Sequence, residues 1–321
     1  MGTWARAGAV LLTALATAYI LQAGDSMAAT ASAPPELMVG DFEDLAPSAV
    51  QESFLSNLEV VPVGRQNITM PILTFHYVRQ PPPMNSDLMG FKLSVSPGDF
   101  AAQMDWLSAN RFHPVDFSDL RAYFAGKRPL PARPVVITLD DGYADLYTTA
   151  YPILKAHGFK AVAYIVSSFV GRDGYVTEDQ LRQMDSNGIE IASHTVHHPN
   201  LARSSGGSVF RELTESKRWL ESVVGHPVLD FAYPSGQFTP SVAWAVQAAG
   251  YNSAVTTYSS TNHSLADRYM WARVRIGGGE SLEDFVHDLG PVMPSITVRV
   301  ADVETVIEPK PVKPPFAARE A

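Results

Sequence analysis

The chain has 321 residues, of which 46% are hydrophobic and 18% charged, enough for one or two globular domains with a substantial core. A mean hydropathy of -0.02 excludes a multi-span membrane protein, and a net charge of -9 argues against a nucleic-acid partner. The absence of cysteine excludes disulfides, thiolate metal sites and a cysteine nucleophile, so any metal must be held by His, Asp or Glu.

The first residues have the layout of a secretory signal peptide. Arg6 precedes an apolar run of roughly 17 residues, and small residues follow it. The run is at the short edge of what spans a bilayer, so a single membrane anchor is the alternative. We therefore expect residues 1–31 to be a signal peptide or anchor, and the protein to be exported to a periplasmic, cell-surface or extracellular location. Residues 32–67 are expected to be a linker with one short helix near residues 47–58, and residues 301–321 a Pro-rich tail.

The remaining segment, residues 68–300, is expected to be the compact domain and alternates strand and helix patterns. Runs rich in β-branched and aromatic residues predict strands at residues 70–78, 134–142, 160–166, 189–194, 229–234, 251–257 and 270–276. Helical spacing with capping residues predicts helices at residues 96–110, 145–158, 177–188, 209–225 and 239–250. Repeated strand–helix units favour an α/β fold with a parallel sheet covered by helices. In such folds the chemistry lies at the carboxyl edge of the strands.

Polar residues gather where the expected strands end. They are His76, Asp140, Asp141, His194, His197, His198 and the turn of residues 234–236. Each alone has an ordinary reading as a turn residue, a surface histidine or a buried histidine. Their joint occurrence at several strand ends favours a functional site. A metal would relieve the repulsion between the two adjacent acids.

Asp141, His194 and His198 are the candidate metal ligands. One carboxylate and two neutral imidazoles suit zinc or another divalent transition metal. Three protein ligands leave coordination positions open for water and substrate, which is the arrangement of a catalytic site.

The neighbouring residues supply the other parts of a hydrolase that acts on an acyl group. Asp140, one residue before the metal ligand, is the candidate general base, and His76 is the candidate acid. Backbone N–H groups of residues 234–236 can hold a tetrahedral oxyanion, and Ser235 is the first of them that is not proline. Spacing alone leaves both amide and ester substrates open.

Four short stretches carry a family resemblance. They are LTFHYV at residues 73–78, TLDDG at 138–142, SHTVHHPNL at 193–201 and FAYPSG at 231–236. The last three resemble the successive motifs of the polysaccharide deacetylases, carbohydrate esterase family four, with the NodB-like homology domain. The first resembles the opening of the poly-β-1,6-N-acetylglucosamine N-deacetylase branch, in which the barrel is circularly permuted.

The resemblance implies a distorted (β/α)7 barrel, circularly permuted in its chain order. It implies a divalent metal, usually zinc with cobalt or nickel as substitutes, bound by Asp141, His194 and His198. It also implies that Asp140 acts as the base and that the opening histidine, His76, acts as the acid.

Two departures from the family pattern stand in the third motif. Ala232 occupies the place of an arginine that braces the base, and Ser235 stands where an aromatic residue is usual. Arg273 is our candidate for orienting the base instead, with an ordinary strand-end charge as the alternative. Ser235 and Tyr233 are the candidate oxyanion and substrate contacts, with core packing as the alternative for Tyr233.

Three further residues have two readings. His287 is the alternative acid, because no clean late motif supplies one. His197 is the alternative metal ligand, because it adjoins His198. Tyr143 either lines a sugar subsite or is an exposed loop aromatic.

The sequence therefore predicts a metal-dependent hydrolase that removes N-acetyl groups from an amino-sugar polysaccharide such as poly-N-acetylglucosamine and releases acetate. Alternatives on the same fold are a deacetylase of peptidoglycan, chitin oligosaccharides or O-acetyl xylan, and a non-catalytic carbohydrate-binding protein. We expect a monomer with no nucleic-acid partner. A membrane tether would run through the N-terminal segment.

Overall fold

The computed structural model describes residues 57–61, 66–290 and 296–299. They fall into two units, one with residues 57–59 and 296–299 and one with the described part of residues 60–295. The expected signal peptide, Pro-rich tail and most of the expected linker lie outside the described residues. Residues 57 and 58 belong to a strand, so the helix expected near residues 47–58 is wrong at that end. None of the helices that the structure describes is long and apolar enough to cross a membrane.

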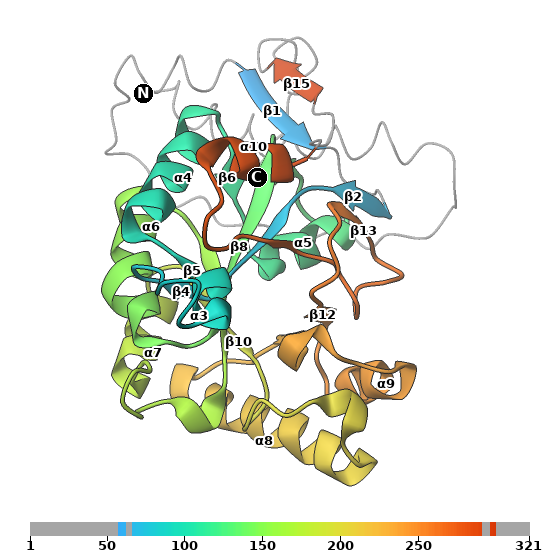
Figure 1. Cartoon of the computed structure of the whole chain (residues 1–321). Helices are drawn as coiled ribbons and strands as arrows, with labels where there is room; N and C mark the ends of the chain where they lie inside the picture. The colour runs from blue at the N-terminus through green and yellow to red at the C-terminus, as the bar shows by residue number, and fades with distance from the viewer. Residues whose placement is uncertain (1–56, 62–65, 291–295, 300–321) are drawn as a thin grey trace, which may run out of the picture. The chain divides into compact units, whose positions relative to one another are not determined.

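A curled parallel sheet forms the centre of the larger unit (Figure 1). Its strands hydrogen-bond in the order β12–β11–β10–β9–β8–β3–β14, and β6 pairs with the start of β8. The bounds are β3 (Ile72–Phe75), β6 (His113–Pro114), β8 (Pro134–Asp141), β9 (Ala161–Ile165), β10 (Ile189–Ser193), β11 (Asp230–Ala232), β12 (Ser253–Val255) and β14 (Val274–Arg275). A parallel bridge between Val255 and Trp271 links β12 to the residues before β14, at the other end of this order. The predicted α/β fold with a distorted barrel is confirmed, in the form of a curled parallel sheet with surrounding helices.

The strand expected over residues 70–78 is two strands, β3 and β4 (Tyr77–Val78). β3 pairs with β8 and β14, whereas β4 leaves that sheet and pairs with β5 (Ser94–Val95). The break falls at His76, so this side chain lies where the chain leaves the carboxyl end of the sheet. The strand expected over residues 270–276 is also shorter, because Arg273 N–H donates to Tyr258 O (2.7 Å) instead of joining β3.

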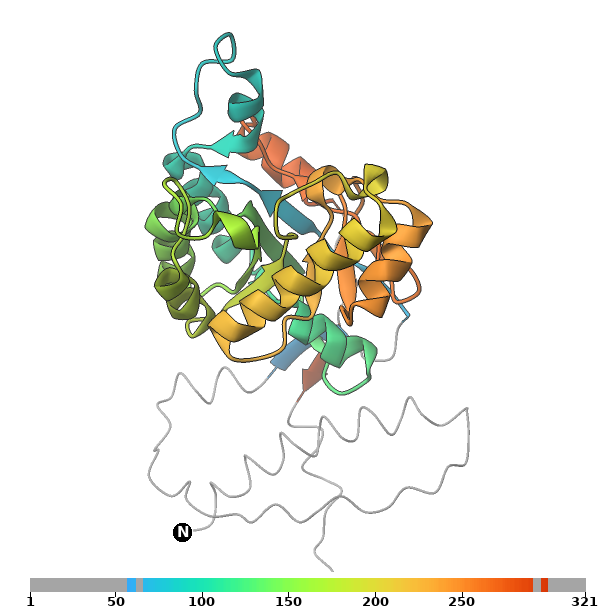
Figure 2. The ribbon, with the colours of Figure 1, turned by 90° about the horizontal axis from the view of Figure 1, so that it is seen from below.

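Helices surround the curled sheet (Figures 1 and 2). They are α3 (Leu88–Leu93), α4 (Pro97–Ala109), α5 (Phe117–Phe124), α6 (Tyr151–Ala156), α7 (Glu178–Asp185), α8 (Gly206–Val224), α9 (Pro240–Ala248) and α10 (Leu282–Asp288). Ser96, Thr177 and Thr239 cap α4, α7 and α9 by accepting backbone N–H bonds, as the sequence predicts. The helix expected over residues 145–158 begins as a π-helical turn, η1 (Leu146–Ala150), and continues as α6.

The remaining elements are short. They are β1 (Asn57–Val61), β2 (Asn67–Thr69), β7 (Leu130–Pro131), β13 (Asn262–Ser264), β15 (Ile296–Arg299), and the 3-10 turns η2 (Ser167–Phe169), η3 (Leu201–Arg203) and η4 (Pro234–Gly236). β2 and β13 pair antiparallel, as do β1 and β7.

The core divides between the two faces of the sheet. Alternate strand residues such as Ile137 and Leu139 pack with the apolar sides of the surrounding helices and so form the outer face. The residues between them, such as Val136, Val162 and Tyr164, form a second cluster that fills the inside of the curl. Every residue of β8 is buried, as expected for a strand covered on both faces. A side chain's position along its strand therefore decides whether it faces the helices or the interior.

We expect Gly236→Ala to destabilise the fold more than Gly225→Ala. Both glycines have a left-handed backbone, with φ of 68° and 81°, so alanine costs each about 1–2 kcal/mol. A Cβ at Gly225 meets nothing within 4 Å, whereas one at Gly236 would lie 2.7 Å from the backbone nitrogen of Thr257. Moving that backbone adds about 1–3 kcal/mol. Urea unfolding of both variants measures the difference, and equal losses would contradict the close approach.

Candidate metal centre and acid–base pair

Inner-face positions bring the candidate residues together at the carboxyl edge of the sheet. On β8, Thr138 and Asp140 continue the inner-face series that begins at Val136. On β3 the same alternation runs from Ile72 to His76. Polar groups from β8 and from the segments next to β3, β10 and β14, which are far apart in the chain, therefore meet in one place.

A buried ion pair joins two of these residues. Both nitrogens Nη1 and Nη2 of Arg273 donate to the carboxylate of Asp140, each at 2.7 Å. The guanidinium also donates to Thr138 Oγ1 (3.0 Å) and to Thr256 O (2.9 Å). Burial alone would raise the pKa of Asp140, but the Arg273 guanidinium outweighs it and holds that pKa well below its usual range. Arg273 thus contacts the predicted base directly, where a bidentate pair fixes the carboxylate's orientation.

Asp141, His194 and His198 form one cluster of ligand-type groups, with ligand atoms all within 4.8 Å of one another. The Nε2 atoms of both histidines lie 3.5 Å from Asp141 Oδ1. His194 Nδ1 donates to Ala232 O (2.7 Å), which leaves Nε2 with its lone pair toward the cluster. Burial lowers the pKa of His194 to about 4, so the ring is neutral at pH 7.

This cluster fits a divalent transition metal such as zinc. Two neutral imidazoles and one carboxylate are a common donor set of catalytic zinc sites. The backbone carbonyl that holds His194 is the kind of partner that orients metal-binding histidines. His197 is not in the cluster, since its ring contacts Glu212 instead.

Unusual backbone geometry is concentrated in the same segments. Asp141, Thr195, His198 and Ser235 all have positive φ, between 54° and 71°. Such a conformation costs a non-glycine residue about 1–3 kcal/mol and is characteristic of functional sites. At Asp141 the positive φ ends the strand alternation of β8. Asp140 can therefore contact Arg273 while Asp141 faces the histidines. No pattern in the sequence indicates this backbone conformation.

His76 lies beside the ion pair. Its Nε2 is 3.9 Å from Asp140 Oδ2, and its Nδ1 is buried without a hydrogen-bond partner among the described residues. Burial lowers the pKa of His76 to about 4, despite the opposing effect of Asp140. The alternative acid, His287, lies on α10 with its side chain 90% exposed and contacts Asp288. The structure therefore brings His76, and not His287, to Asp140.

The turn after β11 places Ser235 at the surface and Tyr233 in the core. Gly236 N–H donates to Tyr233 O (2.8 Å), which closes the turn. Tyr233 has no exposed surface, its ring stacks on Phe238, and its hydroxyl donates to Tyr269 O (2.9 Å). The side chain of Tyr233 packs against aromatic rings of the core and thus offers no surface to a substrate in this structure. This is contrary to its expected role as a substrate contact.

A stack of tyrosines beside the site was not expected. Tyr77 follows His76 and Tyr143 follows the Asp-Asp-Gly motif, and their rings stack with centroids 3.7 Å apart. Tyr175 stacks on Tyr143 at 5.2 Å, and the guanidinium of Arg79 lies 3.5 Å from the centroid of Tyr77. Protein rings thus contact Tyr143 already, which disfavours its use as a sugar-stacking platform. Only the positions of the tyrosines next to the motifs could have hinted at the stack.

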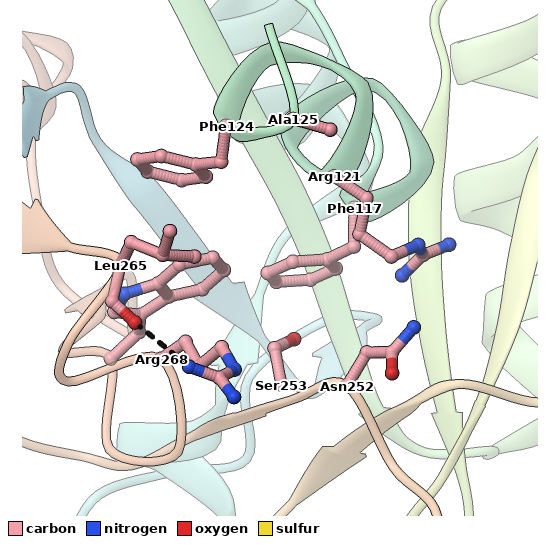
Figure 3. A pocket seen from close by; sticks show the side chains of 9 residues that line it. Phe117, Arg121, Phe124, Ala125, Asn252, Ser253, Leu265 and Arg268 are labelled. Carbon is pink, nitrogen blue, oxygen red and sulfur yellow. Dashed lines mark hydrogen bonds between the residues drawn. The ribbon is translucent and has the colours of Figure 1, made fainter. Parts of the chain in front are cut away.

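A hollow of about 310 Å³ lies elsewhere, between α5 and the start of β12 (Figure 3). It is lined by Phe117, Arg121, Phe124, Ala125, Asn252, Ser253, Leu265, Arg268 and Trp271. None of the candidate site residues is among them. Because Ser253 begins its strand and the site follows the strand ends, this hollow belongs to the opposite end of the sheet.

We expect Arg273→Gln to destabilise the metal-free protein by about 3–5 kcal/mol at pH 7, because it leaves a buried, charged Asp140 unpaired. Arg275→Gln, which changes an exposed arginine two residues on, is the matched control and should cost little. Urea unfolding measures both, and a loss for Arg273→Gln no larger than the control's would refute the pair's importance.

The contribution of Asp140 to the free energy of unfolding depends on pH with opposite signs in the wild type and in Arg273→Gln. In the wild type the lowered pKa of Asp140 makes the pair's stabilisation complete at neutral pH, and it is lost as the pH falls below about 3.9, the unfolded-state value. In Arg273→Gln burial raises that pKa, so the folded state binds more protons than the unfolded state. The difference in free energy of unfolding between the wild type and Arg273→Gln should therefore shrink as the pH falls from 7.

Comparisons with known proteins find similarity to polysaccharide deacetylases. Residues 127–254 match the family model for polysaccharide deacetylases. The Bacillus subtilis (strain 168) protein YxkH, named as a candidate polysaccharide deacetylase, is 29% identical over 212 residues, which cover 66% of this chain and 73% of that protein. A poly-beta-1,6-N-acetyl-D-glucosamine N-deacetylase of Staphylococcus aureus (strain MSSA476) is 26% identical over 201 residues, 56% of this chain and 68% of that protein.

A solved structure extends the likeness to the fold. The Streptococcus pyogenes deacetylase PplD, in complex with acetate, superposes with a TM-score of 0.64 at 26% identity and covers 70% of this chain and 99% of that one. The sequence motifs, the curled sheet and these relatives lead to one conclusion. Residues 127–254 match the polysaccharide deacetylase family model, and the chain is similar in sequence and fold to enzymes of that family.

Proposed function

We propose that this enzyme is metal-dependent and hydrolyses the N-acetyl groups of an amino-sugar polysaccharide, releasing acetate and leaving free amines. The observation that carries the proposal is the convergence at one sheet edge of a three-residue metal-type cluster, a braced carboxylate and a buried histidine. The relative from Staphylococcus aureus is named for poly-beta-1,6-N-acetyl-D-glucosamine, which supports a substrate of that kind. The acetate bound by the Streptococcus pyogenes deacetylase is the product that this reaction releases.

Asp141, His194 and His198 would hold the metal, most suitably zinc, with cobalt or nickel as substitutes. A divalent metal bound there lowers the pKa of water and polarises the acetyl carbonyl. The neutral ring of His194, fixed by Ala232 O, keeps one ligand atom available at neutral pH.

Asp140 acts as the general base. Arg273 keeps its carboxylate ionised and fixed, so that it is ready to accept a proton from the attacking water at neutral pH. Its separate contact with Arg273 explains how adjacent Asp140 and Asp141 take different roles. Arg273 thereby replaces the arginine that the third motif lacks.

His76 gives a proton to the leaving nitrogen. The same burial that keeps the ring neutral at rest makes its protonated form a strong acid. Its Nε2 lies 3.9 Å from Asp140 Oδ2, so the proton that Asp140 takes up is close to the residue that must deliver one. The N–H of Ser235, at the surface of its turn, is the proposed donor to the oxyanion.

The substrate is a polymer outside the cytoplasm, which agrees with the expected export signal. Poly-N-acetylglucosamine is the favoured polymer, because LTFHYV resembles the branch that acts on it. Peptidoglycan, chitin oligosaccharides and O-acetyl xylan present the same acetyl chemistry in other settings. Contacts from the exposed loops around the site determine which of these polymers binds.

Acetate release from poly-N-acetylglucosamine tests the reaction. We expect chelation to abolish release and zinc, cobalt or nickel to restore it, because Asp141, His194 and His198 then regain their ion. His198→Ala should not be rescued by the same metal concentrations. Peptidoglycan fragments, chitin oligosaccharides and acetylated xylan are assayed in parallel. Absence of acetate from every polymer with every metal would overturn the proposal.

Variants of the acid–base pair test the assignment of roles. Asp140→Asn and His76→Gln should each lower acetate release by about 10²–10⁴-fold, because each removes one proton-transfer step. Zinc content should stay at the wild-type level, because neither residue is in the ligand cluster. His287→Gln is the control and should keep full activity. A large loss in His287→Gln with none in His76→Gln would reverse the acid's assignment.

A further inference from the structure

The segment of residues 194–198 carries two of the three metal-type ligands on a strained backbone. Thr195 and His198 have φ of 70° and 58°, and Thr195 Oγ1 accepts the N–H of His198 at 2.9 Å. On one side the end of β9 and the loop after it support the segment through three backbone bonds: His194 N–H to Ile165 O (2.9 Å), Ser167 N–H to Thr195 O (3.1 Å) and Ser168 N–H to Val196 O (3.0 Å). The N–H groups of Val196 and His197 find no partner in that loop.

Glu212 of α8 meets those two N–H groups from the other side. Its Oε2 accepts from Val196 N–H at 2.8 Å and from His197 N–H at 2.9 Å. Its Oε1 lies 2.8 Å from His197 Nδ1, and its side chain is only 12% exposed. A single carboxylate thus fills three hydrogen-bonding positions of the ligand-bearing segment.

The chemistry of these contacts suits a carboxylate. Two adjacent backbone N–H groups beside a left-handed residue form a concave, positively polarised cradle that binds anions. Bonds from N–H groups to an ionised acceptor are also stronger than bonds between neutral groups. One helical turn further on, Ser216 contacts Ser193, the residue before His194, at 2.8 Å. Helix α8 therefore contacts the segment through two residues one helical turn apart, Glu212 and Ser216.

We propose that Glu212 is a positioning residue for the metal centre: it sets the loop conformation that presents His194 and His198 together and draws the adjacent His197 away from them. The motif offers three histidines in five residues, and the carboxylate decides which pair can converge. This inference rests on the proposed metal-dependent function, because it concerns the presentation of that site's ligands.

The test is zinc affinity of the purified, metal-free chain, measured by competition with a chromophoric chelator. Glu212→Ala should bind zinc about 10–100-fold more weakly than the wild type, the usual cost of losing a partner that orients ligands. Glu212→Gln keeps a carbonyl oxygen for the two N–H groups and should recover part of the affinity. Glu215→Ala, which changes an exposed glutamate of the same helix, is the matched control and should bind like the wild type.

His197→Ala separates the two kinds of contact. It removes the ring from Glu212 but leaves both backbone bonds, so its zinc affinity should stay near the wild-type value. Thermal unfolding of the metal-free variants is recorded alongside. If Glu212→Ala lowers the midpoint of unfolding but binds zinc like the wild type when folded, Glu212 is merely structural and the inference is overturned. If the wild type itself binds no zinc, the proposed metal dependence fails first, which distinguishes the two failures.

Discussion

The pair formed by Arg273 and Asp140 is the interaction around which the site is organised. It connects β8 to the residues just before β14, across the intervening strand β3, through two hydrogen bonds inside the curl. A charged carboxylate could not remain there alone, because removing one partner of a buried pair costs about 3–5 kcal/mol. With Arg273 present, Asp140 can be both fully buried and ionised. The neighbouring Asp141 is then free to face the two histidines without an uncompensated charge beside it.

Strand alternation and its interruption explain how so few segments build the whole site. His76 and Arg273, which adjoin the ends of β3 and β14, lie against the inner face of β8, and that face delivers Asp140 by the ordinary period of two. The residues that depart from it, Asp141 and His198, do so through a left-handed backbone. That strain persists because surrounding hydrogen bonds hold it. At His198 these include the bond from its own N–H to Thr195 Oγ1 and the Glu212 contacts one residue earlier.

The sequence was informative where a pattern has a local physical cause. Strand and helix periods, the caps at Thr177 and Thr239, and the gathering of polar residues at strand ends all follow from the chain itself. Arg273 was a candidate partner of Asp140 because the resemblance implies an arginine that the third motif lacks, and the structure brings the two residues together. What depends on packing between distant elements could not be read. The sequence left Tyr233 between substrate contact and core packing, which its burial decides, and nothing in α8 indicated that Glu212 contacts the histidine-bearing segment.

The distance along the chain between Asp140 and Arg273 has a consequence for biosynthesis. The two residues are 133 positions apart, so at ordinary translation rates the cation follows the carboxylate by on the order of ten seconds. During that interval the nascent strands β8 to β12 can pair, but Asp140 has no counter-charge and must stay hydrated. The interior of the curl therefore cannot exclude water around Asp140 until Arg273 has been synthesised. Burial of Asp140 in its ionised form therefore depends on a residue that is synthesised well after it.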